Sequence, residues 1–227
     1  MFDVLDRENT GVIFDGKIRK ENYKKDDKMF YSFSGNVEVE IDQNYFLQGI
    51  GYNEKDFIGL AGAADGAKLI VSNYKLLTEH SFFEVPVAQS IYVDEDGGMS
   101  LFLYTDLLVL KPEYRGNGFA TQMLKHQIDT ARKLNFNSLA LFADGGYGEE
   151  LSGYYIWPRL GFNAQIPQGM VLPDWLQGVQ DILDIMSTFE GRKWWKENGI
   201  PVSMEFSLDE ESKSSKAFNR YLNEKEG

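Results

Sequence analysis

The spacing of hydrophobic residues along the chain changes between a period of two and a period near 3.6, which separates strands from helices. Residues 37–41, Val-Glu-Val-Glu-Ile, alternate and predict a strand. Residues 99–110 and 138–142 are nearly continuous apolar runs, as in strands that are buried on both faces. Between these runs the period is helical and predicts a helix from Phe119 to about Leu134, with its apolar face at Leu124, Ile128, Ala131 and Leu134.

Shorter segments complete the pattern. Residues 69–77 fit a strand or a helix, because their period does not separate the two. The cluster Asp-Gly-Gly at residues 96–98 lies between two β-prone runs and predicts a hairpin turn. Residues 202–208 predict a last strand, and residues 214–226 predict a short helix that Ser214 or Ser215 caps.

This order of elements predicts a mixed α/β domain. A helix connects the strand that ends near Leu110 with the strand that ends near Phe142, which forms a crossover unit. Residues 174–197 also follow a helical pattern and form an insertion before the last strand. Inserted helices must bury apolar surface. We therefore expect the insertion to pack on the main domain through Trp175, Ile182, Ile185, Phe189 and Trp194.

Composition and charge narrow the classes of function. Hydrophobic residues make up 43% and aromatic residues 14% of the 227 residues, which is enough for a normal core. The net charge of −12 leaves no basic surplus for phosphates, so we expect no nucleic-acid partner, whereas a cationic amine suits the acidic field. The sequence has no cysteine, which excludes disulfides, thiolate metal sites and a cysteine nucleophile.

Targeting and metal-binding signals are also missing from the sequence. No apolar stretch approaches the ~20 residues of a membrane helix, and residues 1–11 lack the basic and apolar regions of a signal peptide. We therefore expect a soluble, cytoplasmic protein with no membrane contact. His80 and His126 are isolated and give no metal-ligand spacing, so no metal site is predicted.

The segment from Leu107 to Gln127, LLVLKPEYRGNGFATQMLKHQ, places an arginine and two glycines between a predicted strand and a predicted helix. Glycine permits backbone angles closed to other residues and lets a ligand approach the backbone. The first turn of a helix has unpaired N–H groups and a partial positive charge, and Arg115 adds a cation. This combination predicts an anion-binding turn, although it matches neither the Rossmann nor the Walker motif.

The same segment resembles the acetyl-CoA signature of the GNAT N-acetyltransferase superfamily. The matching pattern is Arg-Gly-Asn-Gly-Phe-Ala, residues 115–120, between a strand and a helix. A second family mark is a short strand followed by a helix that ends in a Leu-Gly-Phe turn, and residues 138–144 and 151–162 match it. The resemblance covers about residues 100–165. It implies a mixed, mostly antiparallel central sheet flanked by helices.

The resemblance also implies one domain that uses acetyl-CoA as cosubstrate. Its parts are the N-terminal extension and first elements (1–65), the acetyl-CoA-binding core (99–166), the helical insertion (168–200), and the last strand and helix (201–227). The backbone of Leu108, Val109 and Leu110 would pair with the pantetheine arm, and an N–H near Leu108 would polarise the thioester carbonyl. The cofactor turn would hold the pyrophosphate and comprises Arg115, Gly116, Asn117, Gly118, Phe119, Ala120 and Thr121.

The family transfers its acetyl group by direct attack of an amine, and an acid protonates the departing thiolate. The usual acid is a tyrosine four residues before the glycine of the Leu-Gly-Phe turn, and that position is Trp157 here, followed by Pro158. We expect Tyr154 to act as the acid, because it lies about one helical turn away on the same face, with Tyr155 as the second candidate. Asp106, on the strand before the turn, is the candidate base.

The sequence therefore predicts an N-acetyltransferase that acts on a primary amine of a small molecule or a protein. The acidic loop at residues 144–150 follows a predicted strand where the family's acceptor pocket often lies, so it is a candidate contact for a cationic acceptor. Because Trp157 replaces the usual tyrosine, a second function stays open. The chain would then be a GNAT-like module without catalysis that binds CoA or another protein.

Overall fold

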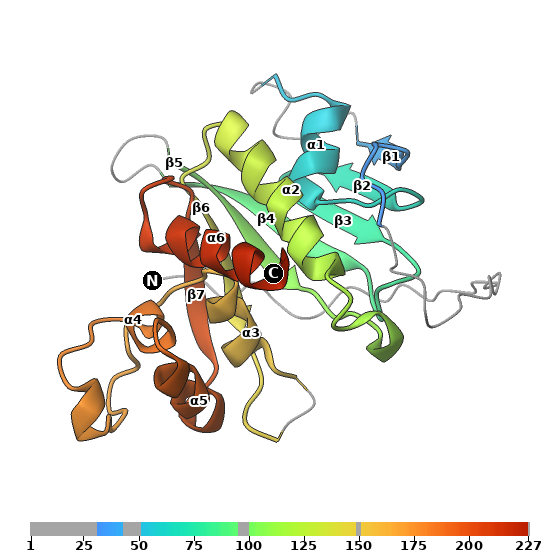
Figure 1. Cartoon of the computed structure of the whole chain (residues 1–227). Helices are drawn as coiled ribbons and strands as arrows, with labels where there is room; N and C mark the ends of the chain where they lie inside the picture. Colours follow the sequence, from blue (N-terminus) through green and yellow to red (C-terminus); the bar gives the residue numbers. More distant parts are fainter. Residues whose placement is uncertain (1–30, 43–50, 95–99, 149–150, 227) are drawn as a thin grey trace.

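One seven-stranded sheet organises the residues that the computed structural model describes, which are 31–42, 51–94, 100–148 and 151–226 (Figure 1). The strands lie side by side in the order of the sequence. They are β1 (Glu38–Ile41), β2 (Lys68–Ser72), β3 (Lys75–Glu79), β4 (Val87–Asp94), β5 (Ser100–Leu107), β6 (Ser138–Ala143) and β7 (Val202–Ser207).

The sheet is mixed and mostly antiparallel. β1 pairs with β2 and β5 pairs with β6 in parallel, whereas the other four neighbouring pairs are antiparallel. This arrangement confirms the predicted fold class. The parallel crossover from β5 to β6 runs through α2 (Phe119–Lys133), as the helical period between the two apolar runs predicted.

The ambiguous segment at residues 69–77 forms a hairpin of β2 and β3. The chain reverses at Asn73, whose φ angle is 51°. Asparagine tolerates this left-handed conformation better than most residues with a side chain, which allows so tight a reversal. The predicted turn at residues 96–98 lies outside the described residues, but β4 and β5 on either side of it pair antiparallel.

The helices α1 (Glu54–Ala61), α2 and α6 (Lys213–Glu226) lie over one face of the sheet (Figure 1). Gly59 of α1 lies so close to Thr130 of α2 that any side chain there would collide with it. This close contact fixes the direction of α2 and therefore the position of its N-terminus. The core between the helices and the sheet includes side chains at most 2% exposed, such as Phe57, Leu60, Leu69, Leu103, Leu124 and Ile128.

The predicted helical insertion contains three short helices instead of one continuous helical pattern. They are η3 (Asp174–Leu176), α4 (Ile182–Met186) and α5 (Phe189–Asn198). Asp181 and Thr188 each accept a backbone N–H and begin a new helix, so the helical phase restarts at α5.

This restart corrects the predicted packing face of the insertion. Ile182 and Ile185 are fully buried, as predicted, but Trp175 and Phe189 are 55% and 70% exposed. Trp195, and not its neighbour Trp194, is the fully buried indole. Because α5 begins at its own cap, its buried side is set by residues 191 and 195, which lie one turn apart.

The insertion also completes the hydrogen bonding of α3 (Gly153–Arg159), which contains Pro158 in its interior. A proline has no N–H to donate to the carbonyl four residues earlier, which here belongs to Tyr154. The indole N–H of Trp195 donates to that carbonyl instead, at 2.8 Å. The insertion is therefore held to α3 at the backbone position that the proline leaves unpaired.

The N-terminal cap of α6 is Ser212 and not Ser214 or Ser215, which corrects another prediction. The Ser212 hydroxyl accepts the backbone N–H of Ser215 at 3.1 Å. Ser214 and Ser215 are buried, and the Ser214 hydroxyl accepts the N–H of Ser207 at the end of β7. Both serines thus lie in the first turn of the helix and bind it to the segment before it, Ser214 at Ser207 and Ser215 at the C=O of Asp209.

Candidate functional site

β5 and β6 separate at their carboxyl ends, beside the turn that the sequence singles out. Their parallel pairing ends at Thr105 and Leu141. β5 nevertheless continues to Leu107 and β6 continues to Ala143. The two strands therefore diverge over their last residues, and we call the opening between them the strand gap.

The segment after β5 is hydrogen-bonded to residues 82–84 on one side. The backbone groups on its other side face the strand gap. The C=O of Val109 accepts the N–H of Glu84 at 2.9 Å. The backbone groups of alternate residues in an extended chain point to opposite sides. The N–H groups of Leu108 and Leu110 therefore point away from Glu84 and toward the gap. Among the described residues, none accepts a hydrogen bond from either N–H.

The turn after this strand presents backbone N–H groups to open space. It begins with the short helix η2 (Pro112–Tyr114). Gly116 and Gly118 follow with φ angles of 78° and 85°, which residues with side chains rarely adopt. A Cβ atom on either glycine would meet no other atom within 4 Å. The space above both glycines is therefore open to a ligand.

α2 begins at this turn without a side-chain cap. Gly118 is its N-cap residue, and its first turn contains no acidic residue. The N–H groups of Phe119, Ala120 and Thr121 therefore have no acceptor within the helix. Together with the dipole of a 15-residue helix, they make a partially positive site. Such a site suits a phosphate or another anion.

Arg115 braces the turn against the neighbouring segment. Its Nε donates to the C=O of Leu110 at 2.7 Å, and its guanidinium forms an ion pair with Glu84 at 3.0 Å. Its backbone N–H donates to Pro112 at 3.2 Å, so the N–H donors available to an anion begin at Gly116. The contact of Arg115 with a bound anion stays a prediction. The side chain of Asn117 donates to the C=O of Glu113 at 3.3 Å.

Phe119 anchors the start of α2 in an aromatic cluster. Its side chain is 1% exposed, and its ring centroid lies 4.9 Å from that of Tyr31, 5.0 Å from Phe82 and 5.7 Å from Phe83. The cluster holds the first N–H groups of α2 beside the segment that pairs with Val109. Local sequence patterns give no signal for it, because its members come from segments far apart in the chain.

Asp106 lies on β5 just beyond the last residue that pairs with β6, at the edge of the strand gap. The hydroxyl of Ser90 on β4 donates to its Oδ2 at 3.0 Å. Partial burial raises the pKa of the Asp106 carboxyl above its usual value, although the Ser90 hydrogen bond and the charge of Lys75 act in the opposite direction. A carboxylate with a raised pKa is a stronger proton acceptor, as a general base requires.

Tyr154, the predicted acid, is buried between α3 and α5. Its side chain is 3% exposed, and its hydroxyl donates to the C=O of Lys196 at 2.6 Å. Its backbone N–H donates to the C=O of Asp144, directly after β6, at 3.0 Å. The hydroxyl therefore has a structural partner in the insertion, and its role as an acid stays a prediction.

The two other aromatic residues of α3 also have packing partners. The ring of Tyr155 lies 5.8 Å from the guanidinium of Arg159 and 5.9 Å from the ammonium of Lys196. Trp157, at the usual tyrosine position, packs against Phe162 with 5.2 Å between the ring centroids. The indole of Trp157 thus contributes to packing at the end of α3.

The acidic loop after β6 is described only in part. Asp144 accepts the N–H of Gly145 at 2.8 Å, and Tyr147 is 65% exposed. Residues 149 and 150 lie outside the described residues. Across the described ranges, no three potential ligands gather as a metal site would require. No helix in those ranges is long and apolar enough to cross a membrane.

A comparison with family models identifies the family of this chain. Residues 21–147, more than half of the chain, match the family model for the acetyltransferase (GNAT) family. Naa50 of Arabidopsis thaliana, in complex with the bisubstrate analogue CoA-Ac-MVNAL, is 16% identical over 57% of this chain and 77% of its own, with a TM-score of 0.29. YncA of Salmonella typhimurium, with its cofactor acetyl-CoA, is 19% identical over 61% and 66%, with a TM-score of 0.31. No curated protein matches the chain.

Proposed function

Because this chain belongs to the GNAT acetyltransferase family, we propose that it transfers the acetyl group of acetyl-CoA to a primary amine. The observation that carries the proposal is the turn at residues 116–121, which offers backbone N–H groups and open space next to the strand gap. Family membership supports acetyl-CoA as the acyl donor and an amine-bearing acceptor. The individual roles below are proposals for this chain's own residues.

Acetyl-CoA fits the residues at the turn and the gap. Its pyrophosphate requires N–H donors and a positive potential, which the backbone from Gly116 to Thr121 supplies at the N-terminus of α2. A side chain on Gly116 or Gly118 would fill space that the phosphates need. The amides of the pantetheine arm would pair with the backbone edge formed by Leu108, Val109 and Leu110, as an added strand pairs with a sheet edge.

Acetyl-CoA supplies an acetyl group that is activated as a thioester. Transfer joins the amine nitrogen to the acetyl carbon while the carbon–sulfur bond breaks, and overall one proton moves from nitrogen to sulfur. The N–H of Leu108 points toward the gap and would donate to the thioester oxygen as negative charge develops on it. Loss of one such donor typically lowers turnover by about 10²–10³-fold.

Asp106 would accept the proton that the attacking amine loses. It lies at the edge of the gap, and its raised pKa makes it a better proton acceptor than an ordinary surface carboxylate. The hydrogen bond from Ser90 to Oδ2 would fix the orientation of the carboxylate, and its second oxygen would accept the proton.

We expect the pH profile of kcat/KM to report on Asp106. The base acts as a carboxylate, so activity should rise with pH through the raised pKa of this group. Asp106→Asn should remove that rising limb and lower kcat/KM by about 10²-fold. Ser90→Ala removes a hydrogen bond that lowers this pKa, so the limb should move to higher pH. Steady-state kinetics of the three proteins across pH tests the assignment, and identical profiles would contradict it.

Tyr154 would donate the proton that the departing sulfur gains. A phenol with a pKa near ~10 can donate to a thiolate in the transition state. Its hydroxyl would have to exchange its bond to the C=O of Lys196 for this task. Tyr155, its neighbour in α3, is the second candidate for the acid.

Tyr154→Phe removes only the hydroxyl and separates its two roles. As the acid, Tyr154 should be needed for turnover, which we expect to fall by ~10²-fold with little change in CoA affinity. As the partner of Lys196, it should also contribute about 1 kcal/mol to the free energy of unfolding. Tyr155→Phe is the matched control and should keep full turnover. Reduced stability with full turnover in Tyr154→Phe would restrict this residue to a structural role.

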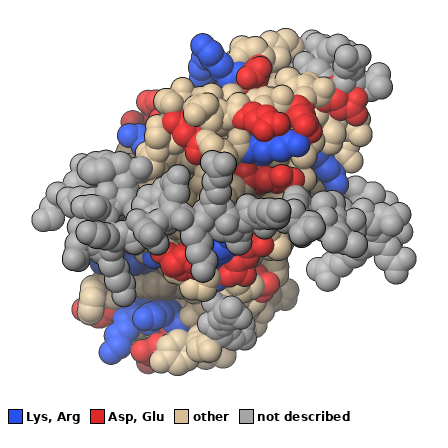
Figure 2. Space-filling model, turned by 90° about the vertical axis from the view of Figure 1, so that its right-hand side faces the viewer, with Lys and Arg blue, Asp and Glu red and all other residues tan. Residues whose placement is uncertain are grey.

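The acceptor is expected to be a cationic amine, on a small molecule or a protein. The chain carries a net charge of −12, and Figure 2 shows acidic side chains spread among basic ones on the visible face. The loop at residues 144–150 adds acidic groups directly after β6, so it is our candidate for contact with the acceptor.

One observation favours a second candidate function, which is binding of CoA without transfer. The usual tyrosine position is Trp157, which packs against Phe162, and the hydroxyl of Tyr154 is held by Lys196. A chain of this second kind would bind CoA at the turn and release no CoA thiol from acetyl-CoA with any amine.

A further inference from the structure

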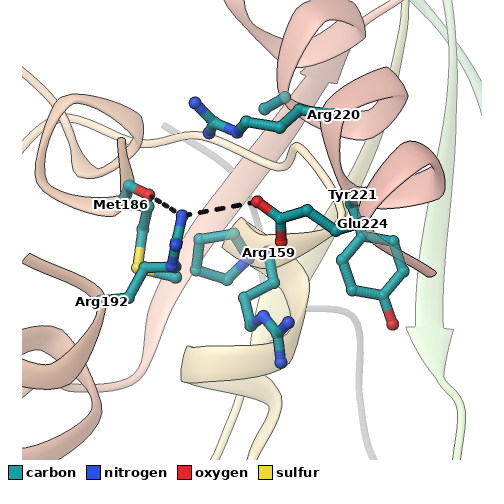
Figure 3. Close-up of a pocket in the computed structure, with 8 residues that line it drawn as sticks. Arg159, Met186, Arg192, Arg220, Tyr221 and Glu224 are labelled. Carbon is teal, nitrogen blue, oxygen red and sulfur yellow. Dashed lines mark hydrogen bonds and ion pairs between the residues drawn. The ribbon is translucent and has the colours of Figure 1, made fainter. Parts of the chain in front are cut away.

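Outside the proposed acetyl-CoA site, ionisable side chains meet where α3, α5 and α6 come together (Figure 3). Arg192 is directed at Glu224, whereas the guanidiniums of Arg159 and Arg220 point to opposite sides. These charges lie between neighbouring helices and serve their packing. His80 differs from them, because both nitrogens of its ring contact backbone groups of segments close to the cofactor turn.

His80 directly follows β3, and its half-buried ring connects two loops. Its Nδ1 accepts the backbone N–H of Phe82 at 3.2 Å, and its Nε2 lies 3.2 Å from the C=O of Asp65. A backbone N–H can only donate and a carbonyl can only accept. Nδ1 therefore carries no proton and Nε2 carries one. Both bonds exist together only in the neutral ring with its proton on Nε2.

Phe82 opens the segment that pairs with the proposed pantetheine-binding edge. Its C=O accepts the N–H of Lys111 at 3.0 Å, and the N–H of Glu84 donates to the C=O of Val109 at 2.9 Å. The ring centroid of Phe82 also lies 5.0 Å from that of Phe119, the first residue of α2. A shift of this segment would therefore move both the backbone edge and the start of α2.

We propose that neutral His80 is a positioning residue for acetyl-CoA, because it holds Phe82 and thereby the backbone edge that would pair with the pantetheine arm. This inference rests on the proposed acetyl-CoA site. A protonated ring carries an N–H at both nitrogens, so it cannot accept a hydrogen bond from Phe82. Protonation of His80 thus releases this N–H, and acetyl-CoA binds more weakly as the pH falls.

The surroundings of His80 favour its neutral form. Burial lowers the pKa of the ring below its usual value of about 6.5, the bond to the C=O of Asp65 raises it, and the charge of Lys111 lowers it further. Because the pKa is lowered on folding, the contribution of the neutral ring to stability is complete above about pH 6.5. It is lost as the pH falls from there through the pKa of the folded protein.

The charged groups on the elements packed around His80 are Asp65, Glu79, Glu84 and Lys111. Hydrogen bonds from Ser32 and Ser34 lower the pKa of Asp65 to about 2, far below the range in which His80 titrates. Glu84 pairs with Arg115 at 3.0 Å. Of the four groups, Lys111 is the one whose charge acts on the pKa of His80, and it disfavours the protonated ring.

Two substitutions separate the roles of the two ring nitrogens. His80→Asn places a carbonyl oxygen near the position of Nδ1, so it keeps an acceptor for Phe82 and has no proton to gain. His80→Gln places an amide N–H near the position of Nε2, so it keeps a donor for Asp65 but loses the acceptor for Phe82. Both lose the ring itself. We expect CoA to bind His80→Gln about 5–10-fold more weakly than His80→Asn at neutral pH.

The test is calorimetric titration of the full chain with CoA between about pH 5.5 and 8. A phosphate monoester also titrates near pH 6, so the wild type is compared with His80→Asn at each pH. The affinity of the wild type relative to His80→Asn should fall as the pH decreases. His126→Gln removes the other histidine of the chain, which is exposed on α2, and should keep the pH dependence of the wild type. Thermal unfolding of each variant checks that the fold is kept.

Amide hydrogen exchange tests the same contact without CoA. The N–H groups of Glu84 and Lys111 should exchange faster in His80→Gln than in His80→Asn. The inference is overturned if these variants match in exchange and in CoA affinity, or if the wild type and His80→Asn keep a constant affinity ratio across pH. In either case CoA binding by the wild type leaves the proposed function standing. Failure of the wild type to bind CoA at any pH would contradict the proposed function and, with it, the role of His80 in binding.

Discussion

Gly118→Asp is expected to abolish CoA binding, with a rise in Kd of at least ~100-fold. The residue is the N-cap position of α2 and has a φ angle of 85°. A Cβ atom added to it would meet no other atom within 4 Å, so the space around it is open. An aspartate there would place a negative charge at the proposed pyrophosphate position. Calorimetry with CoA measures the effect.

The matched control for this change is Gly169→Asp. Gly169 has a φ angle of 87°, and a Cβ atom on it would also meet nothing within 4 Å. The two substitutions therefore impose similar backbone strain and add the same charge, but only one lies at the turn. Gly169→Asp should bind CoA like the wild type. Equal affinity of the two variants for CoA would refute the assignment of the turn as the phosphate site.

Trp195→Ala is expected to lower the free energy of unfolding by about 3–5 kcal/mol. The indole is fully buried. Its N–H donates to the carbonyl of Tyr154, which receives no backbone hydrogen bond from Pro158 because proline has no N–H. The alanine would leave a large cavity next to Gly199, which packs against the indole. It would also leave the Tyr154 carbonyl without its indole donor. Equilibrium unfolding in urea measures the loss.

Two further variants divide this loss into its parts. Trp194→Ala changes the neighbouring, half-buried indole and should cost clearly less than Trp195→Ala. Trp195→Phe keeps most of the ring and loses the N–H, so it should cost about 1–3 kcal/mol. If the two tryptophan-to-alanine changes cost the same, the packing face assigned to α5 is wrong.

The regular elements of the fold follow from local patterns. The helical spacing of Leu124, Ile128 and Ala131 predicted α2, and all three are buried against the sheet. The buried face of the insertion was harder to predict, because the residues that point inward depend on where each short helix starts. Thr188 caps α5 and moves Trp195 inward, whereas a continuous helical pattern had favoured Trp194. A cap changes the buried face without changing the hydrophobic pattern on which the prediction rested.

In the candidate site, too, features made by neighbouring residues could be predicted from the sequence, whereas contacts between distant segments could not. The glycine turn before α2 was visible in the sequence, because Arg115, two glycines and the start of a helix follow one another directly and together predict an anion site. The partners of the site's side chains were not visible, because they lie far away in the sequence. Arg115 pairs with Glu84 in the segment before β4, and Asp106 on β5 accepts a hydrogen bond from Ser90 on β4. Tyr154 was chosen by helical spacing within α3, but its hydroxyl partner lies in the insertion.

The measurement that tests the central claim most directly is the release of CoA thiol from acetyl-CoA, followed with a panel of primary amines. The panel should span small polyamines and peptides with free amino groups, and the wild type should be compared with Gly118→Asp and Gly169→Asp. We predict amine-dependent release by the wild type and by Gly169→Asp, and none by Gly118→Asp. CoA binding without release by the wild type across the whole panel would contradict acetyl transfer and favour the non-catalytic CoA-binding function.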